Sequence, residues 1–389
     1  MRRSKVVTVF TSIYNRAYII NTLYQSLQRQ TCKDFEWIII DDGSQDNIVQ
    51  IVNQWMEMDR NEFAIRFYSV NNGGKHRAIN KAVKIAQGDT FFIVDSDDYI
   101  TDDAIAWIED KWSDLQDDGS FAGIAGLKIL KSGKLTGTGK LTFNEYVDAT
   151  NLEREKYSLD GDKAEVYKTE VLRKFSFPEY ENENFVTEAV VWNKIAYEGY
   201  KIRWFNKVIY ICDYLEDGLS KNIQTVIANN PKGWAEYIAC RYKYESQNRN
   251  QYIEECRNHF KNCFEKVSLN ELAGIWGLDD EELQDISVEF HNELKRYDDF
   301  MKANHIQNFA LYGYGVCGKR TKRYLNYLGY KEKYIIDKNA KQIEKVPAYS
   351  LEDQMPQVEN IIICVKRDVE DIKRQISKIF PQVDIYENP

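Results

Sequence analysis

Three carboxylates stand within four residues of each other in the N-terminal third of the chain. Asp95, Asp97 and Asp98 follow an apolar run that ends at Val94. Like charges this close repel each other unless a cation lies among them. On an extended segment residues 95 and 97 point the same way, so both can face one hard divalent ion with phosphate oxygens in its shell. The alternative is a helix N-cap with first-turn acids, opening a helix near Asp102.

A second acidic pair, Asp41 and Asp42, follows the apolar run Trp37–Ile40. The sequence Asp-Asp-Gly-Ser is favourable in a turn, and Asp46 is placed to cap the helix that follows. Because the pair also ends a predicted strand beside the loop at Thr11–Arg16, it fits equally well an aspartate that binds a base or a ribose.

These acidic residues need secondary-structure elements that bring them together. The pattern of the first 115 residues predicts such elements. Strands and helices alternate. Strands are predicted at Lys5–Thr11, Phe35–Ile40, Ala64–Val70 and Thr90–Val94, and helices at Arg16–Gln30, Ile48–Met58, Arg77–Gln87 and Asp102–Trp112. This alternation indicates βαβ units and a largely parallel sheet. The carboxyl ends of such strands line a ligand crevice, so we expect the acidic clusters to meet there.

The pattern changes after residue 115, which suggests three parts. Strands are predicted at 121–129, 140–143, 164–167 and 202–212, with a helix at 185–197; residues 230–303 are mostly helical; strands at 308–312, 333–336 and 360–365 then alternate with helices at 318–328 and 369–379. We therefore expect domains at 1–228, 229–304 and 305–389. The aromatic residues of the middle part favour helix packing over a sugar-binding groove.

Five segments together resemble the inverting, metal-dependent glycosyltransferases of family 2, which have the GT-A fold. The segments are TSIYNR from Thr11, WIIIDDGSQDN from Trp37, NNGGKHRAIN from Asn71, GDTFFIVDSDD from Gly88 and FVTEAVVW from Phe185. Their order and spacing are more specific than any one of them, and the resemblance spans roughly residues 5–220.

Two positions depart from the family pattern. Ser12 stands where family members often have Pro, and Ile79 stands where many have the Arg of an Ala-Arg-Asn triplet. The second departure removes an Arg that would face the nucleotide, and Lys75, His76 or Arg77 is expected to replace it.

The resemblance implies a donor site. Thr11 and Tyr14 would flank the nucleobase. Asp41 would accept a hydrogen bond from the imide N–H of the base, which favours uracil, and Asp42 is the second candidate. Lys75 would lie near the nucleotide.

The resemblance also implies a cation site. Asp95 would hold the ribose or the metal shell, Asp97 would bind Mn²⁺ or Mg²⁺ directly, and Ser96 belongs to the same cofactor-binding set. Breaking a glycosyl–phosphate bond leaves negative charge on the diphosphate, and a divalent cation stabilises that charge.

The acceptor hydroxyl must lose a proton as it attacks, and a carboxylate within hydrogen-bond reach can take it. Glu188, at the start of a predicted helix, is the candidate base. Its alternative role is to compensate the helix dipole. Glu183 and Asp98 are competing candidates. The segment Leu215–Lys221 reads either as a lid over the diphosphate, with Ser220 and Lys221 as contacts, or as a solvated turn.

Two further motifs lie outside this resemblance. Cys256, His259 and Cys263 share one helical face, where core packing is favoured over a metal site. Gly313, Gly315 and Gly318 form a G-x-G-x-x-G motif after a predicted strand, and Asp337 follows at the end of the next strand. This matches the dinucleotide fingerprint.

The C-terminal part, however, is shorter than a complete dinucleotide domain. It resembles small Rossmann-like modules appended to sugar-processing enzymes of bacterial polysaccharide pathways. We therefore favour a structural or protein-interaction role for its glycines over a bound nucleotide.

The composition of the chain restricts the classes of partner and the cellular location that we expect. The formal net charge is −9, so no global basic field for nucleic acid exists. No apolar run approaches the roughly 20 residues that span a bilayer, and the N-terminus does not read as a signal peptide. The cysteines are odd in number, without a C-x-x-C pair, which favours a reducing compartment. We expect a cytoplasmic protein, compatible with peripheral association at the inner face of the membrane.

The sequence therefore predicts an α/β enzyme that moves a sugar from a nucleotide-diphosphate donor, with UDP favoured, to a glycan, lipid-linked or protein acceptor. Polysaccharide, cell-wall and glycoprotein glycan synthesis are all open. Two other classes remain: an NAD-dependent oxidoreductase using the C-terminal fingerprint, and a non-catalytic carbohydrate-binding scaffold. Metal-dependent hydrolysis of the donor separates the enzyme from the scaffold.

Overall fold

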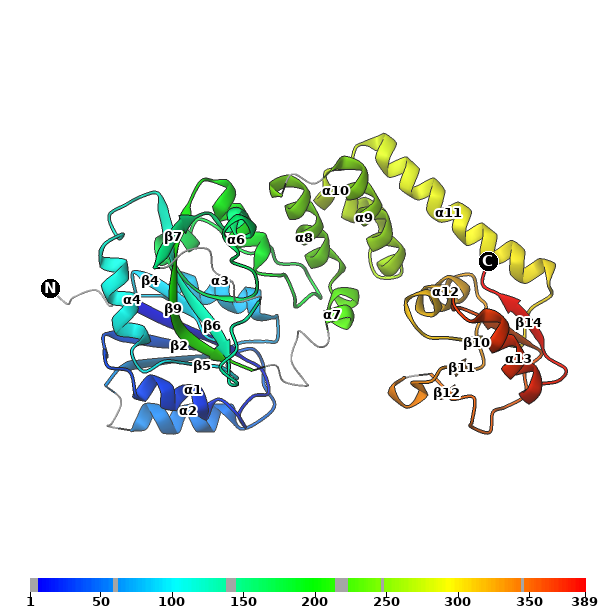
Figure 1. Cartoon of the computed structure of the whole chain (residues 1–389), viewed down its shortest axis with the longest axis horizontal. Helices are drawn as coiled ribbons and strands as arrows, with labels where there is room; N and C mark the ends of the chain where they lie inside the picture. Colours follow the sequence, from blue (N-terminus) through cyan, green and yellow to red (C-terminus); the bar gives the residue numbers. More distant parts are fainter. Residues whose placement is uncertain (1–5, 59–61, 138–144, 214–222, 246–247, 344–345) are drawn as a thin grey trace. The chain divides into compact units, whose positions relative to one another are not determined.

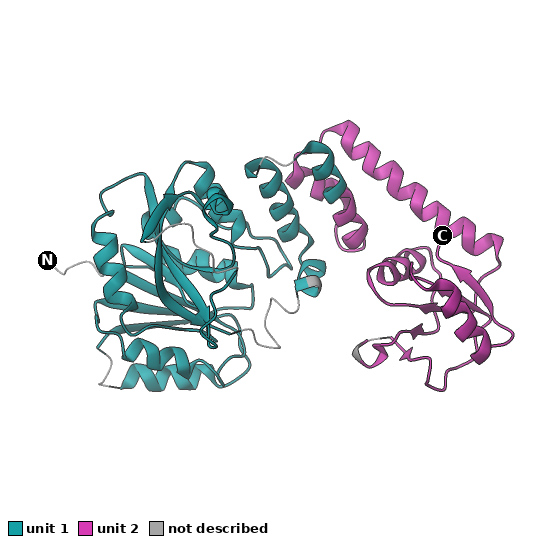
Figure 2. Cartoon of the chain, viewed as in Figure 1, with its two compact units in different colours: residues 1–256 teal, residues 257–389 magenta. Residues whose placement is uncertain are grey.

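The computed structural model describes residues 6–58, 62–137, 145–213, 223–245, 248–343 and 346–389 (Figure 1). The chain divides into two compact units, residues 1–256 and 257–389, coloured separately in Figure 2. The expected three-part division stays a prediction. The expected strand at 140–143 and the segment Leu215–Lys221 fall outside the described residues. No helix among the described residues combines the length and the apolar character that crossing a membrane would require.

The N-terminal unit is built on a sheet that has nine strands in the described residues, ordered β3-β2-β1-β4-β8-β6-β9-β5 with β7 beside β9. The strands are β1 (Val7–Ile13), β2 (Phe35–Asp41), β3 (Ala64–Ser69), β4 (Thr90–Ile93), β5 (Tyr99–Ile100), β6 (Phe121–Leu130), β7 (Tyr146–Ala149), β8 (Lys163–Lys168) and β9 (Lys201–Cys212). Strands β1 to β4 are parallel, as predicted.

The second half of this sheet differs from the largely parallel sheet that we expected. Strand β8 runs antiparallel to both β4 and β6, and β9 runs antiparallel to β5 and β7. Parallel neighbours need a long crossover, usually a helix. The described residues between β6 and β8 contain no α-helix, only β7 and short 3₁₀ turns, which suits an antiparallel return.

Helices cover both faces of the sheet. The helices of the N-terminal unit are α1 (Asn21–Gln28), α2 (Ile48–Glu57), α3 (Lys75–Ile85), α4 (Ala104–Ser113), α5 (Thr169–Leu172), α6 (Ala189–Tyr197), α7 (Ile223–Asn229) and α8 (Pro231–Tyr244). Alternate residues of a strand face opposite sides. Accordingly, Val9 packs in the core with α1, α2 and α4, while Phe10 packs in the core with α3 and α6.

The C-terminal unit is a small parallel α/β fold preceded by helices. Helix α9 (Arg249–Cys263) crosses the unit boundary, and α10 (Leu269–Trp276) and α11 (Asp280–Ala303) follow. The sheet order is β12-β11-β10-β13-β14 and every pairing is parallel. Its elements are β10 (Phe309–Tyr312), α12 (Val316–Tyr327), β11 (Ile335–Ile336), β12 (Ala348–Tyr349), β13 (Asn360–Ile363), α13 (Val369–Ile379) and β14 (Asp384–Glu387). The predicted α/β class with a Rossmann-like module is therefore confirmed.

Candidate functional site

The acidic segment after β4 is a turn, not the extended run that we expected. The backbone N–H of Asp98 donates to the carbonyl of Asp95 at 3.1 Å. The polar Ser-Asp pair inside the turn favours this conformation over extension. Because β5 intervenes and α4 begins only at Ala104, the reading of these acids as a helix cap is wrong.

One ammonium group joins the two acids for which the sequence predicts separate roles. Lys75, the first residue of α3, places Nζ 2.5 Å from Oδ1 of Asp95 and 2.9 Å from Oε1 of Glu188. Burial alone would lower the pKa of Lys75, but the two carboxylates raise it overall. Burial likewise opposes ionisation of Asp95, yet Lys75 and Lys128 hold its pKa below the ordinary value. The end of β4 and the start of α6 therefore meet at Lys75.

The hydroxyl of Tyr210 fixes the acidic turn from the side of β9. It accepts from the backbone N–H of Asp95 at 3.0 Å and donates to Oδ2 of Asp98 at 2.8 Å. Burial, followed by the charge of Asp95, raises the pKa of Asp98 to about 7. Asp98 is thus held inside the protein by Tyr210, which weakens its candidacy as the base. Nothing in the sequence marks Tyr210, because only the pairing of β9 with β5 brings it here.

Asp97 is the third acid of the turn, and nearby positive charges compensate its negative charge only in part. Burial and the charge of Asp95 raise the pKa of Asp97, while Arg16 and Lys75 lower it. Carboxylate oxygens crowded in this way suit a hard divalent cation. No group of three or more potential metal ligands occurs in the described part of the chain. A cation held by Asp95 and Asp97 would need further ligands from outside the described residues, and this binding stays a prediction. Ser96, between them, is buried.

The two glutamates proposed as the base occupy different environments. The side chain of Glu188 is 38% exposed and faces Lys75. The carboxylate of Glu183 is buried and accepts from the backbone N–H groups of Lys232 and Gly233, at 2.9 and 2.8 Å. Those groups lie in the first turn of α8, where N–H groups lack partners within the helix. Glu183 caps α8, and this leaves Glu188 as the stronger candidate base.

The aspartates after β2 are both buried and both bonded within the protein. Asp41 accepts from the N–H of Ser44 at 2.9 Å and from the hydroxyl of Ser69 at 3.1 Å. Asp42 accepts from the N–H groups of Gly73 and Gly74, at 2.8 Å each, and burial raises its pKa. Asp42 therefore ties this loop to the turn that leads into Lys75. To contact a nucleobase, Asp41 would use the carboxylate oxygen that now accepts from the hydroxyl of Ser69.

The two residues expected beside the nucleobase differ in exposure. Tyr14 is 49% exposed and is available for stacking. Thr11 is fully buried: its hydroxyl donates to the carbonyl of Val94 at 2.8 Å and accepts from Trp37 Nε1 at 3.0 Å. This placement gives Thr11 a structural role between β1 and β4 and leaves no surface with which to contact a base.

A glycine fixes the distance between the Lys75 loop and the Glu188 loop. Gly74 has φ +92°, and a Cβ at this position would lie 1.7 Å from the carbonyl oxygen of Asn184. The backbones on the two sides of the site are therefore in direct contact, four residues before Glu188.

A second group of charged residues lies beside the acids, and no pattern in the sequence predicts it. The ammonium of Lys128, on β6, lies 4.2 Å from the ring centroid of Tyr210, and the charges of Asp95 and Glu165 raise its pKa against the effect of burial. Glu165, on β8, lies 3.6 Å from Arg154. An antiparallel partner for β4 was not expected, so these positions could not be placed near the acids from the sequence.

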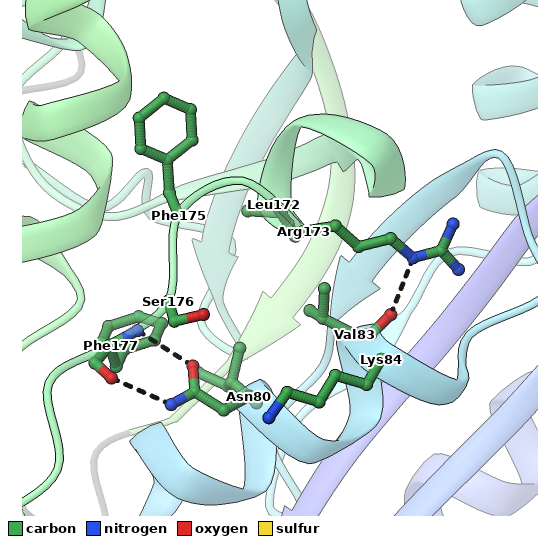
Figure 3. A pocket seen from close by; sticks show the side chains of 9 residues that line it. Asn80, Val83, Lys84, Leu172, Arg173, Phe175, Ser176 and Phe177 are labelled. Atoms are coloured by element: carbon green, nitrogen blue, oxygen red, sulfur yellow. Dashed lines mark hydrogen bonds between the residues drawn. The ribbon is translucent and has the colours of Figure 1, made fainter.

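A separate hollow of about 200 Å³ lies between α3 and the segment after α5 (Figure 3). Asn80 exchanges hydrogen bonds with the backbone of Phe177, and Arg173 donates to the carbonyl of Val83. None of the acids described above lines this hollow, so it is not part of the candidate site.

The two C-terminal motifs are engaged in packing. Cys256, His259 and Cys263 are buried. A Cβ on Gly318 would lie 1.9 Å from the carbonyl oxygen of Gly313, so this glycine is needed for close approach of α12.

The acid of the C-terminal fingerprint is bonded within its own unit. The carboxylate of Asp337, expected at a ribose, accepts from the backbone N–H of Tyr314 at 2.7 Å. Both contacts fit the structural role that the sequence favours for this motif.

Comparison with known sequences gives the family. Residues 8–132 match the profile of glycosyl transferase family 2. This match assigns residues 8–132, about a third of the chain, to a family 2 glycosyltransferase domain. The matched region holds β1 to β6, with both acidic clusters and Lys75, so the predicted resemblance is confirmed for this glycosyltransferase domain.

Named relatives are each similar to this chain over part of its length. The poly(ribitol-phosphate) beta-glucosyltransferase of Bacillus spizizenii is 34% identical over 131 residues, covering 32% of this chain and 20% of that protein. Glycosyltransferase GlyG of Streptococcus pneumoniae is 31% identical over 102 residues, covering 26% of this chain and 33% of that protein. Chondroitin synthase of Pasteurella multocida is 35% identical over 105 residues, 27% of this chain and 11% of that protein. The similarity thus spans a third or less of each relative.

Among solved structures, residues 1–349 of Staphylococcus aureus TarS in complex with UDP-GlcNAc are similar at 19% identity and a TM-score of 0.47. The alignment covers 74% of this chain and 92% of that one.

Proposed function

We propose that the glycosyltransferase domain moves a sugar from a nucleotide-diphosphate donor, with UDP favoured, to an acceptor hydroxyl with inversion. The observation that carries the proposal is the convergence of Asp95 and Glu188 on Lys75. This convergence supports the proposal because both carboxylates lie at one end of the sheet, where ligands bind in open α/β folds.

The residues divide the chemistry between them. Glu188 takes the proton of the acceptor hydroxyl as that oxygen attacks the sugar. Lys75 offers positive charge to the departing diphosphate, and Tyr14 stacks on the base. Asp95 and Asp97 would hold Mn²⁺ or Mg²⁺, which when bound supplies further charge stabilisation for the diphosphate.

The acceptor is proposed from the relatives alone. The names of the Bacillus and Pasteurella proteins refer to poly(ribitol-phosphate) and to chondroitin. We therefore place the acceptor among polysaccharides or cell-wall polymers. A cytoplasmic location fits the odd number of cysteines, seven, and the lack of a C-x-x-C pair in the sequence.

A thermal-shift screen of nucleotide sugars with and without Mn²⁺ identifies the donor, because a ligand stabilises the folded state by mass action. The preferred donor then serves in an assay of transfer or hydrolysis. If no nucleotide sugar stabilises the protein, the proposal fails.

A pair of glutamate variants tests the base. Glu188→Gln should lower turnover by roughly 10²–10⁴-fold while keeping donor binding, because it removes the proton acceptor. Glu183→Gln should do the reverse: it weakens the cap of α8 and lowers stability by about 1 kcal/mol, with turnover largely retained. Turnover of Glu188→Gln at the wild-type level would move the base elsewhere.

A further inference from the structure

Asp95, the acid expected at the metal shell, forms an ion pair with a positively charged side chain of the protein. Oδ1 of Asp95 lies 2.5 Å from Nζ of Lys75, and the two side chains are 37% and 28% exposed. Lys75 also pairs with Glu188 at 2.9 Å, so one ammonium serves two carboxylates of the site.

The Lys75 ammonium and a divalent cation would compete for the carboxylate of Asp95. A divalent cation on Asp95 would meet the ammonium at close range in a partly buried place, where like charges repel more strongly than in water. Lys75 must therefore give up its bond to Asp95, or the ion must bind weakly. The nearby Lys128 raises the local positive charge further, since it too lowers the pKa of Asp95.

The side chain of Lys75 can move while helix α3 stays in place. The backbone just before it is fixed, because Asp42 binds the N–H groups of Gly73 and Gly74. The lysine side chain is a flexible stem that carries a compact charge. It can swing to a new anionic partner while α3 stays in place.

We propose that Lys75 is a counter-ion switch that makes the binding of a divalent cation depend on the nucleotide. In the free protein Lys75 holds Asp95 and Glu188. When the diphosphate arrives, the ammonium turns to a phosphate oxygen and frees Asp95 for the cation and Glu188 for the acceptor. The inference rests on the proposed donor class and adds an order of binding to it.

The test measures Mn²⁺ affinity directly, by the electron paramagnetic resonance signal of free Mn²⁺ titrated with the full chain, with and without UDP. In the wild type, UDP should tighten Mn²⁺ binding by roughly fivefold or more, and Mn²⁺ should tighten UDP by the same factor. Lys75→Met should bind Mn²⁺ without UDP roughly fivefold or more tighter than the wild type, and UDP should then add less.

Three controls separate the switch from a loss of structure. Lys75→Gln keeps hydrogen bonding without charge and should behave as Lys75→Met does. Lys75→Arg keeps the charge and should bind Mn²⁺ alone as weakly as the wild type. Lys84→Met removes an exposed lysine from the same helix and should change nothing. Thermal unfolding of each variant reports whether it is folded.

Equal or weaker Mn²⁺ affinity of folded Lys75→Met and Lys75→Gln without UDP overturns the switch. That failure leaves stabilisation by nucleotide sugars intact. A failure of the proposed function appears instead as a wild-type protein that no nucleotide sugar stabilises.

Discussion

His76 follows the switch lysine and is the clearest case of a titratable side chain held in one state. It is 2% exposed, and its Nδ1 has no hydrogen-bond partner among the described residues. Burial, followed by the charge of Arg77, lowers the pKa of His76 to about 4. The folded protein therefore keeps this imidazole neutral at pH values where an unfolded chain would protonate it.

The consequence is a loss of stability in acid. The unfolded chain takes up this proton below about pH 6.5, whereas the folded protein resists until about pH 4. Stability from His76 is thus complete above pH 6.5 and falls as the pH drops toward 4. Urea unfolding at about pH 7 and about pH 4.5 should show the wild type losing on the order of 2 kcal/mol relative to His76→Gln. A difference that does not change with pH would contradict the assignment.

Among the elements, the turn into α3 is the part whose geometry the site demands most strictly. Gly74 and Gly133 both have positive φ, at +92° and +82°, but only Gly74 of these two faces a neighbouring backbone. A Cβ at Gly133 would meet no atom of the described residues within 4 Å. The two glycines form a matched pair in one unit.

Alanine at each position separates backbone strain from steric contact. Gly133→Ala should lower the free energy of unfolding by about 1 kcal/mol, because alanine is less favourable than glycine at a positive φ. Gly74→Ala should cost roughly 1–3 kcal/mol more and should weaken donor binding, because the turn must move away from Asn184. Urea unfolding and the donor thermal shift measure both effects. Equal losses of stability in the two variants would show that the contact at Gly74 relaxes without cost.

The elements also show how far the sequence can predict this fold. The strands β1 to β4 and the helices between them follow from hydrophobic period and turn residues. The antiparallel placement of β8 does not, because register between distant strands leaves no local pattern. The roles that depend on it, such as that of Tyr210, were therefore missed. The convergence of Lys75, Asp95 and Glu188 was only half predicted: each residue was named, but the ion pairs follow from tertiary contacts.

For the whole molecule, the candidate site described above lies within residues 1–256, while the glycine fingerprint lies within 257–389. Gly318→Ala places a Cβ against the carbonyl of Gly313 and should destabilise the C-terminal unit by roughly 1–3 kcal/mol. The thermal shift produced by the donor should persist. Calorimetry with and without UDP-sugar measures both, and loss of the donor shift would contradict the separation. Titration with NAD(H) tests the oxidoreductase alternative on the same unit.

The hydrogen bonds of Asp42 predict how this part of the sequence varies among relatives. One carboxylate holds the backbone of both Gly73 and Gly74, so the loop after β2 and the turn before α3 cannot drift independently. Among relatives, replacement of the acid at position 42 should coincide with a rebuilt turn at 73–74. An alignment in which the two vary without correlation would show that evolution does not treat them as a single module.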